Sequence, residues 1–198
     1  MMPEKPTLQP SKKWDKRRMK EISNALQSDL FDFFNDEENE LGSKDEHGSW
    51  YIRFKLEDGP YAGQTHIMKL KWIYGTPANT YEFPQSPPMV NFITPIWHTN
   101  ISSSGGSVCL DTIKENWTSA AGLEFVFNSI IALLTEPGVN SPFNIEACKD
   151  WKEHGESDPA SYAKICSRYY KKHIRSSKAS ELLDSKKFTC AKKVKKDK

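Results

Sequence analysis

Apolar and polar residues alternate along two stretches in the first half of the chain. One stretch runs from Trp50 to Leu56 and the other from His66 to Trp72, and in both the largely apolar set occupies every second position. This period is typical of a strand with one buried face. Val90 and Phe92 indicate a third or fourth strand. The connections are too short for helical crossovers, so the pattern predicts an antiparallel meander.

Helical spacing precedes and follows these strands. Apolar residues recur at helical intervals over 19–34, which predicts a long N-terminal helix that begins near Ser11, and an acidic connector follows at 36–46. The stretch 123–134 has the spacing of a buried amphipathic helix and is followed by a Pro-Gly pair. Two further helices are expected at about 143–152 and 159–174. Together these elements predict an α+β fold.

Length and composition describe one nearly neutral domain with extensions. A core of about 150 residues can bury roughly 70% of the surface that its unfolded chain exposes, so 198 residues suffice for one domain. The net charge of +2 does not by itself indicate a nucleic-acid or membrane partner. The sequence has no apolar run long enough to span a bilayer and no signal-peptide core, so a cytoplasmic or nuclear protein is expected.

The two ends of the chain differ from its middle. Residues 1–10 contain three prolines and are expected to be a flexible leader. Residues 11–175 form the predicted catalytic domain. The stretch 176–198 is rich in lysine and is predicted to be a disordered tail. One alternative is that this tail binds nucleic acid or an acidic partner.

A Ser/Gly run leads to a cysteine just past the middle of the chain. The four cysteines are too scattered for a disulfide framework, and they lack the Cys-x-x-Cys spacing of a zinc site. Cys109, between Val108 and Leu110, could be an ordinary buried residue. The run 102–107, however, cannot pack a core and is typical of a surface loop. We therefore expect Cys109 to be accessible.

Several motifs occur in a fixed order around this cysteine. They are His98-Thr99-Asn100, Cys109-Leu110-Asp111 after a spacing of eight residues, and Trp117-Thr118-Ser119-Ala120, with 81–83 and 87–92 upstream and 133–137 and 140–147 downstream. In this order the motifs resemble the active-site signature of ubiquitin-conjugating enzymes, over roughly residues 12 to 174. The resemblance implies a four-stranded antiparallel sheet with a central core helix and two C-terminal helices.

The resemblance also implies an activity. The enzyme would accept ubiquitin from a ubiquitin-activating enzyme as a thioester on Cys109 and transfer it to a lysine of a protein substrate, usually with a RING-type ligase. Because the activating enzyme uses the ATP, the chain itself needs no cofactor and no metal. Two alternatives remain: the cargo is a ubiquitin-like modifier, or the chain is a weakly active adaptor, since Thr99 and Ser119 replace prolines of the usual motif.

Roles for individual residues follow from the same resemblance. Asn100 would stabilise the oxyanion of the transfer step or keep the loop in shape, and His98 would hold the turn that positions Asn100. A cysteine protease would need a histidine base and a group that orients it, and His98 is the only candidate nearby. Trp97 and Phe143 would shape the groove above the thiol, Leu110 and Asp111 would lie under the donor's C-terminal tail, and Ser141 stands where many members have Asp. Contacts with the activating enzyme and ligases would come from Lys16, Arg17, Lys20, Phe83, Trp117 and Ser119.

Overall fold

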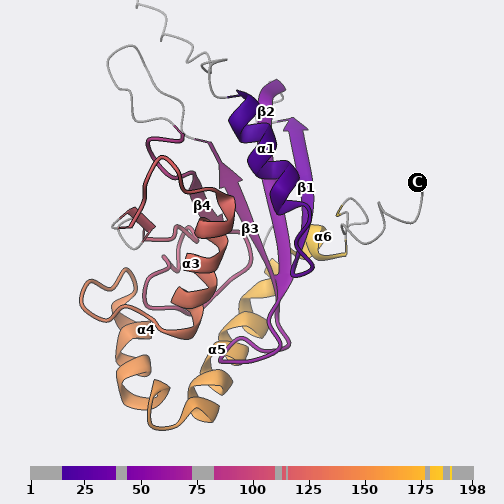
Figure 1. Cartoon of the computed structure of the whole chain (residues 1–198). Helices are drawn as coiled ribbons and strands as arrows, with labels where there is room; N and C mark the ends of the chain where they lie inside the picture. The colour runs from indigo at the N-terminus through magenta and orange to yellow at the C-terminus, as the bar shows by residue number, and fades with distance from the viewer. Residues whose placement is uncertain are drawn as a thin grey trace, which may run out of the picture.

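The described part of the chain forms an α+β domain (Figure 1). The structure is a computed structural model, and it describes residues 15–38, 44–72, 83–109, 113–114, 116–176, 179–184 and 188. The predicted leader, the lysine-rich end of the tail and residues 73–82 lie outside these ranges.

The described residues contain one four-stranded antiparallel sheet with the strand order β1-β2-β3-β4. Its strands are β1 (Phe31–Glu38), β2 (Lys44–Lys55), β3 (Thr65–Lys71) and β4 (Met89–Phe92). Ile52 pairs with Phe33 on one side and with Met68 on the other, and Leu70 pairs with Val90. The predicted meander is confirmed, because each strand pairs with the next one along the chain.

The helices surround this sheet. They are α1 (Asp15–Ala25), α3 (Leu123–Thr135), α4 (Ile145–Asp150), the π-helical turn η2 (Trp151–Gly155), α5 (Pro159–His173), the short 3-10 helix η3 (Ile174–Ser176) and α6 (Ala179–Leu183). Figure 1 shows α1 and α3 on one side of the sheet, with α4 and α5 below α3. The central helix and the two C-terminal helices are therefore close to their predicted positions.

The main core lies between the sheet and α3. Period-two alternation sends Phe33, Ile52 and Met68 to this inner face, where they belong to one buried cluster with Val126 and Ile130 of α3. Apolar area removed from water stabilises such a cluster by about 25 cal/mol per Å². The apolar face of α3 is therefore buried against the inner face of the sheet.

The N-terminal helix is shorter than the sequence pattern predicts. α1 ends at Ala25, and the aromatic residues from Phe31 onward form β1. Phe31 and Phe33 alternate with Asp32 and face the core, while Met19 is largely exposed. Pairing with β2 satisfies the backbone of this stretch, so strand pairing prevailed over a helical spacing that is ambiguous for short apolar runs. The expected acidic connector is likewise partly strand, since β1 continues to Glu38 and β2 begins at Lys44.

The C-terminal segment is folded over the outer face of the sheet. The prediction of disorder from residue 176 is wrong for 179–184 and 188, which the structure describes as α6 and a buried Phe188. Phe188 packs with Tyr51 and Ile67 of the sheet, and the Arg53 guanidinium lies 4.5 Å from the centre of its ring. Burial of the apolar residues of this segment against the sheet outweighs the tendency of its charged composition toward disorder.

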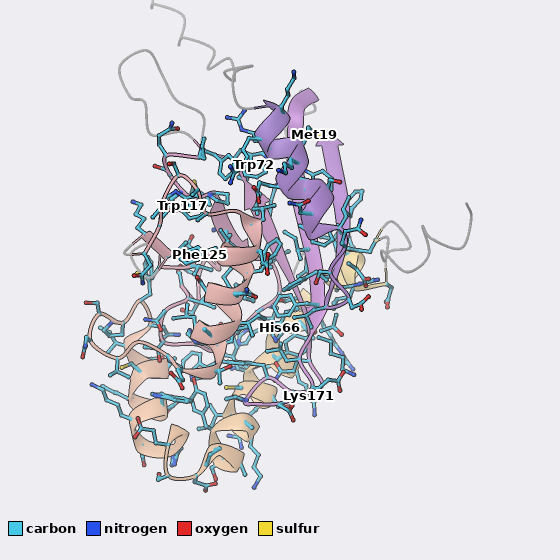
Figure 2. The ribbon with its side chains drawn as sticks, viewed as in Figure 1. Met19, His66, Trp72, Trp117, Phe125 and Lys171 are labelled. Atoms are coloured by element: carbon cyan, nitrogen blue, oxygen red, sulfur yellow. The ribbon has the colours of Figure 1, made fainter. Side chains whose placement is uncertain are left out.

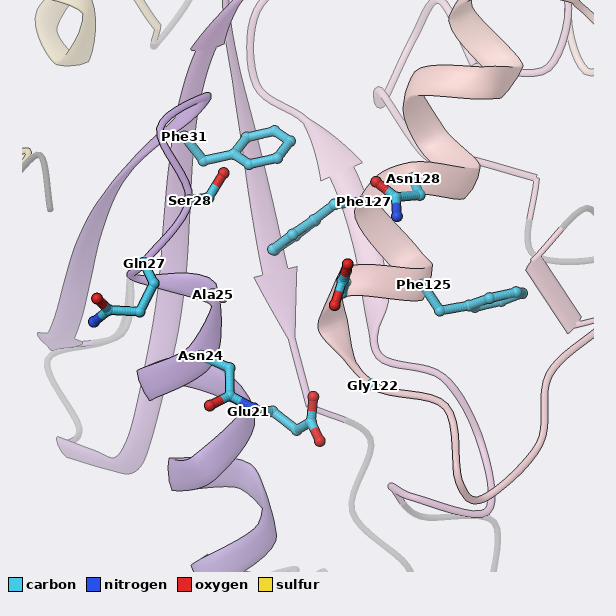
Figure 3. Close-up of a pocket in the computed structure, with 11 residues that line it drawn as sticks. Glu21, Asn24, Ala25, Gln27, Ser28, Phe31, Gly122, Phe125, Phe127 and Asn128 are labelled. Carbon is cyan, nitrogen blue, oxygen red and sulfur yellow. The ribbon is translucent and has the colours of Figure 1, made fainter.

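A glutamate of α1 caps the N-terminus of α3. Glu21 accepts a hydrogen bond of 3.0 Å from the backbone N–H of Leu123, and it pairs with Arg17 at 2.7 Å. Gly122 precedes the helix and supplies no side-chain cap of its own. A Cβ on Gly122 would collide with the Glu21 carboxylate. Figure 3 shows Glu21 extending from α1 toward Gly122, in a groove of about 780 Å³ between the two helices.

Candidate active site

Cys109 lies at the end of a tight loop that is fastened to β4. Two backbone hydrogen bonds hold the loop against β4. Phe92 N–H donates to the Gly106 carbonyl at 2.7 Å, and Val108 N–H donates to the Val90 carbonyl at 3.2 Å. Gly106 has a φ of +66°, and a Cβ there would meet the Phe92 carbonyl, so the close approach requires glycine. The Ser/Gly run thus forms the surface loop that its composition predicts.

Cys109 is half-buried, in contrast to the other cysteines that the structure describes. Cys148 and Cys166 are buried. Burial raises the pKa of the Cys166 thiol to about 12, so this group stays protonated and unreactive near neutral pH. Among the described cysteines, Cys109 alone combines exposure with a loop position.

His98 supports the loop from inside. It is fully buried, its Nε2 lies 2.9 Å from the Leu133 carbonyl, and its Nδ1 accepts a 2.9 Å hydrogen bond from the backbone N–H of Asn100. This pattern places the proton on Nε2. Burial lowers the pKa of His98 to about 4, so the ring is neutral at physiological pH. Both nitrogens are engaged, which fits the expected turn-holding task and not that of a base for the thiol.

The Asn100 side chain braces a second loop. Its Nδ2 donates to the Gly138 carbonyl and its Oδ1 accepts from the Gly138 N–H, both at 2.8 Å. Its backbone carbonyl accepts a 2.9 Å hydrogen bond from the N–H of Cys109. One residue therefore ties the thiol to the loop after α3. The Asn100 amide nitrogen carries two hydrogens. One is donated to the Gly138 carbonyl, and the expected oxyanion role would require the other to be donated to the oxyanion.

Residues 138–144 form the loop that contacts Thr99 and Asn100. The backbone N–H groups of Phe143 and Asn144 both donate to the Thr99 carbonyl, at 2.8 and 2.9 Å. Asn144 also caps α4, since its Oδ1 accepts from the Ala147 N–H at 3.1 Å. Ser141 and Phe143 are exposed on the same loop. The structure therefore brings Asn100, Ser141 and Phe143 into one region, as the sequence predicts.

Trp97 makes different contacts from those expected. Its indole N–H donates to Asp150 at the end of α4 at 2.8 Å, and its ring packs on Tyr169 of α5 with centroids 4.9 Å apart. Its carbonyl accepts a 2.8 Å hydrogen bond from the Tyr61 hydroxyl. These contacts attach the chain before the active-site loop to the C-terminal helices, and they do not support a place in the groove above the thiol.

The residues expected to contact partner proteins come together at one end of the molecule. Lys16 and Lys20 are exposed on α1, and Ser119 is exposed on the loop before α3. Arg17 links the two elements, because its guanidinium donates to the carbonyls of Ala120 and Ala121 at 3.1 and 3.3 Å. The helix and the loop thus form one continuous surface.

The structure contradicts the expected contact between Phe83 and a ligase. Its side chain is completely buried, so it cannot itself contact a ligase as expected. It packs between Trp72 and Trp117, with ring centroids 4.7 and 6.1 Å away. Trp117 donates its indole N–H to the Pro84 carbonyl at 2.9 Å and packs on Phe125 of α3. Figure 2 shows Trp72, Trp117 and Phe125 in the upper half of the molecule.

Two residues of the expected site lie outside the described ranges, and two residues that hold the site or its surroundings were not expected from the sequence. Leu110 and Asp111 lie outside the described residues. Sequence reasoning missed Glu21 and Gly138. The four-residue spacing of Arg17 and Glu21 on a helix was a signal for an ion pair, but nothing local pointed to Leu123 as a partner.

The described residues show neither a metal-binding cluster nor a membrane-spanning helix. The described residues contain no cluster of three or more His, Cys, Asp or Glu side chains that could hold a metal ion. None of the helices within the described ranges has the length and apolar composition needed to cross a membrane.

Fold and site together define a class of protein: an α+β domain in which Cys109, the one cysteine of the described residues that is not buried, lies on a loop held by a buried His-x-Asn turn. The model of the ubiquitin-conjugating enzyme family matches residues 17–169. The chain belongs to this family, and the resemblance inferred from its motifs is confirmed.

Individual relatives agree with this assignment. Ubiquitin-conjugating enzyme E2-20 kDa of Schizosaccharomyces pombe is 34% identical over 113 residues, which are 57% of this chain and 60% of the relative. Ubiquitin-conjugating enzyme E2 K of Homo sapiens is 37% identical over 99 residues, which are 50% of this chain and 46% of the relative. The matches thus span about half the length of these curated relatives.

Solved structures share the fold. A protein of Plasmodium yoelii described as a ubiquitin conjugating enzyme has a TM-score of 0.62 at 28% identity, and the match covers 83% of this chain and 96% of that one. An E2 domain of Toxoplasma gondii has a TM-score of 0.59 at 23% identity, over 79% of this chain and 96% of that one, and supports the fold alone. The predicted α+β architecture is therefore confirmed.

Proposed function

We propose that the protein carries ubiquitin as a thioester on Cys109 and transfers it to lysine side chains of protein substrates. The observation that carries the proposal is the partial exposure of Cys109 on a loop that Asn100 and Gly106 hold in place. The other described cysteines are buried, so they cannot receive a protein's carboxyl end.

The proposed reaction has two steps. In the first, the Cys109 thiolate attacks the carbonyl carbon of the activating enzyme's thioester, a new C–S bond forms, and the activating enzyme's sulfur leaves as thiolate. In the second, a deprotonated lysine amine attacks the same carbon, the C–S bond breaks, and an amide forms with release of the Cys109 thiolate. The amine's proton passes to solvent. Neither step assigns a metal or cofactor to this chain.

Partner binding belongs to the same proposal. The exposed lysines of α1 and the loop that Arg17 ties to this helix offer one continuous surface to an activating enzyme and a RING-type ligase. A cytoplasmic or nuclear location would fit these partners. Ubiquitin is the modifier favoured by the names of the relatives, and a ubiquitin-like modifier is the alternative cargo.

A charging assay tests the proposal. The full chain is mixed with an activating enzyme, ATP and ubiquitin, or in parallel with each ubiquitin-like modifier and its own activating enzyme. A gel shift of one modifier that reductant removes is expected with ubiquitin, and Cys109→Ala should abolish it. Cys109→Ser should give an adduct that resists reductant, because an oxygen ester replaces the thioester. Cys148→Ala is the control and should charge normally; absence of any adduct would assign the chain to the adaptor alternative.

Asn100 is tested in the second step. Asn100→Ala is expected to charge and then to discharge to free lysine at least tenfold more slowly, because it loses both the brace to Gly138 and the amide near the reacting carbon. Gly138→Ala is the comparison, since a Cβ there crowds the Asn100 amide and leaves its chemistry intact. Equal slowing in both variants would assign Asn100 to loop shape alone.

A further inference from the structure

Two adjoining hollows lie along one side of α5. The first has a volume of about 320 Å³ and the second of about 500 Å³, and Tyr169 and His173 line both of them. The first is completed by Trp97, Ile165, Arg168 and Lys172, and the second by residues 92–96 and 102–106. Because the hollows share two residues, they form one continuous groove, the α5 groove.

The α5 groove ends beside the loop that presents Cys109. Residues 102–106 form one of its walls, and Cys109 follows this wall after Ser107 and Val108. α5 lies in the lower part of the molecule and α1 in the upper part (Figure 1). The groove is therefore separate from the surface of α1 that is proposed for the activating enzyme and the ligase, and it adjoins the active-site loop.

The rim of the groove is positively charged. Arg168 and Lys172 are exposed about one helical turn apart, and within the described part of the chain neither forms an ion pair with a carboxylate. None of the described residues that line the groove is acidic. The Asp150 carboxylate is engaged elsewhere, since it accepts the Trp97 indole N–H at 2.8 Å. An acidic ligand thus meets two cations without a competing carboxylate in the lining.

The smaller hollow has an apolar and aromatic floor. Trp97 and Ile165 are half-buried there, and the stems of the two basic side chains add methylene groups. Tyr169 packs on Trp97 with ring centroids 4.9 Å apart and on His173 at 4.5 Å. Because two rings already pack against Tyr169, its ring is less open to nucleic-acid bases, which bind single-strand sites by stacking. The hollow is better suited to an aliphatic side chain.

We propose that the α5 groove docks an acidic segment that carries one apolar side chain, in the protein substrates of this enzyme. The inference rests on the proposed function, because it needs a substrate whose lysine reaches Cys109. The apolar side chain occupies the hollow beside Trp97 and Ile165, and carboxylates on either side of it pair with the basic rim. The part of the substrate that contains the lysine extends along the Ser/Gly loop.

Peptide binding to the uncharged full chain tests the groove without any use of ubiquitin. The probe is a short fluorescein-labelled peptide in which glutamates flank one leucine, and fluorescence polarisation reports its binding. Replacing the leucine by serine should weaken binding about fivefold, the effect of partly burying one aliphatic side chain. Lys172→Glu should weaken binding at least threefold, and Arg168→Glu combined with Lys172→Glu at least tenfold, because attractive contacts become repulsive.

Lys171→Glu is the matched control. Lys171 is exposed in the same last turn of α5 and carries the same charge as Lys172, but it lines neither hollow. This variant should bind the peptide within twofold of the unchanged protein. Equal binding of the leucine and serine peptides, or equal losses in Lys171→Glu and Lys172→Glu, would overturn the proposal. Tighter binding of an oligothymidine of matched charge would also overturn it and assign the groove to nucleic acid.

A second measurement tests the role in substrates. The two peptides, each with one added lysine, are mixed with the purified ubiquitin thioester of the full chain, and single-turnover discharge is followed against peptide concentration. The leucine peptide should reach half of its maximal rate at a concentration at least threefold lower than the serine peptide. Lys172→Glu should raise that concentration at least threefold, whereas Lys171→Glu should leave it within twofold.

The possible failures are distinguishable. Binding of the leucine peptide without this advantage in discharge would overturn the role of the groove in substrates. Failure of the unchanged protein to charge would instead contradict the proposed function, while peptide binding would still decide whether the groove takes an acidic segment.

Discussion

Two buried polar atoms near Cys109 have no hydrogen-bond partner within the described part of the chain. They are the Oγ1 atom of Thr99 and the Nδ2 atom of Asn144, which belong to residues joined by a backbone hydrogen bond. A buried hydroxyl without a partner costs about 1–3 kcal/mol of desolvation free energy. The two unpartnered atoms therefore lower local stability beside the proposed site, a frequent property of functional loops.

Thr99→Val is expected to raise the free energy of unfolding by about 1 kcal/mol. The substitution replaces the buried hydroxyl with a methyl group of similar size and keeps the carbonyl that holds Phe143 and Asn144. Urea denaturation followed by tryptophan fluorescence measures the change. A loss of stability would mean that the hydroxyl is satisfied in solution.

A second histidine is buried in an aromatic environment. His66 is completely buried, its ring lies 5.5–6.0 Å from those of Phe54, Tyr61, Phe92 and Tyr170, and its Nδ1 is 3.1 Å from Thr94 Oγ1. Burial lowers the pKa of His66 to about 3 and, as described, that of His98 to about 4. The folded state therefore holds both rings neutral, while the unfolded chain protonates them below pH 6.5.

Acid is accordingly expected to destabilise the protein well above the pH at which carboxylates titrate. Because the unfolded state binds the protons, the free energy of unfolding is unaffected above pH 6.5 and falls as the pH drops below it. Each histidine should cost about 1.4 kcal/mol between pH 7.5 and 5.5. Urea titrations at both values measure the difference, and His66→Leu should remove about half of it. An unchanged difference in that variant would contradict the assignment.

At the scale of elements, α3 depends on α1 for its N-terminus. The sequence places Gly122 where a serine or threonine would ordinarily cap the helix. Glu21 supplies the missing acceptor across a separation of 102 residues, and its negative charge lies at the positive end of the helix dipole. The glycine is the residue that leaves room for this carboxylate.

The two positions should therefore be coupled. Glu21→Ala is expected to lower the free energy of unfolding by about 1–2 kcal/mol, and Gly122→Ala should cost a similar amount because the new methyl group displaces the carboxylate. In the Glu21→Ala background the same Gly122→Ala change should be neutral or slightly stabilising, since alanine restricts the unfolded chain. A double-mutant cycle measures the coupling, and additive effects would contradict it.

At the scale of the whole molecule, the sheet is covered on both faces. α3 and α1 lie on one side, and the C-terminal segment closes the other through Leu182, Leu183 and Phe188. Arg53 organises this cover, because it pairs with Asp32 at 2.9 Å and donates to the Leu183 carbonyl at 3.2 Å. The described residues after α5, at 174–176, 179–184 and 188, are thus part of the folded domain.

Phe188→Ser is expected to lower the free energy of unfolding by about 2 kcal/mol, the contribution of one buried aromatic side chain. Phe143→Ser is the matched control, since Phe143 is mostly exposed, and it should change stability by less than about 0.5 kcal/mol. Thermal unfolding of the three proteins measures both effects. Equal stability of Phe188→Ser and the unchanged protein would show that the outer cover contributes nothing to folding.

Much of the fold and part of the site follow from short-range patterns. Period-two alternation identified β2 and β3, helical spacing identified α3, and the composition of the Ser/Gly run indicated an accessible Cys109. These features are readable because the spacing of neighbours along the chain sets which side chains share a face. The ordered motifs around the cysteine likewise gave the family.

Only the tertiary structure decided where contacts between segments far apart in the sequence override these local patterns. β1 replaced the end of a predicted helix because β2 paired with it, and Phe188 became ordered because the outer face of the sheet was apolar. The inward turn of Phe83 and the cap from Glu21 depend on partners that the local sequence does not name. The amino-acid sequence alone determined the chemistry and its order along the chain. Packing between segments that are far apart in the sequence decided which of these side chains are accessible, because burial and hydrogen bonding depend on a residue's neighbours in the folded protein.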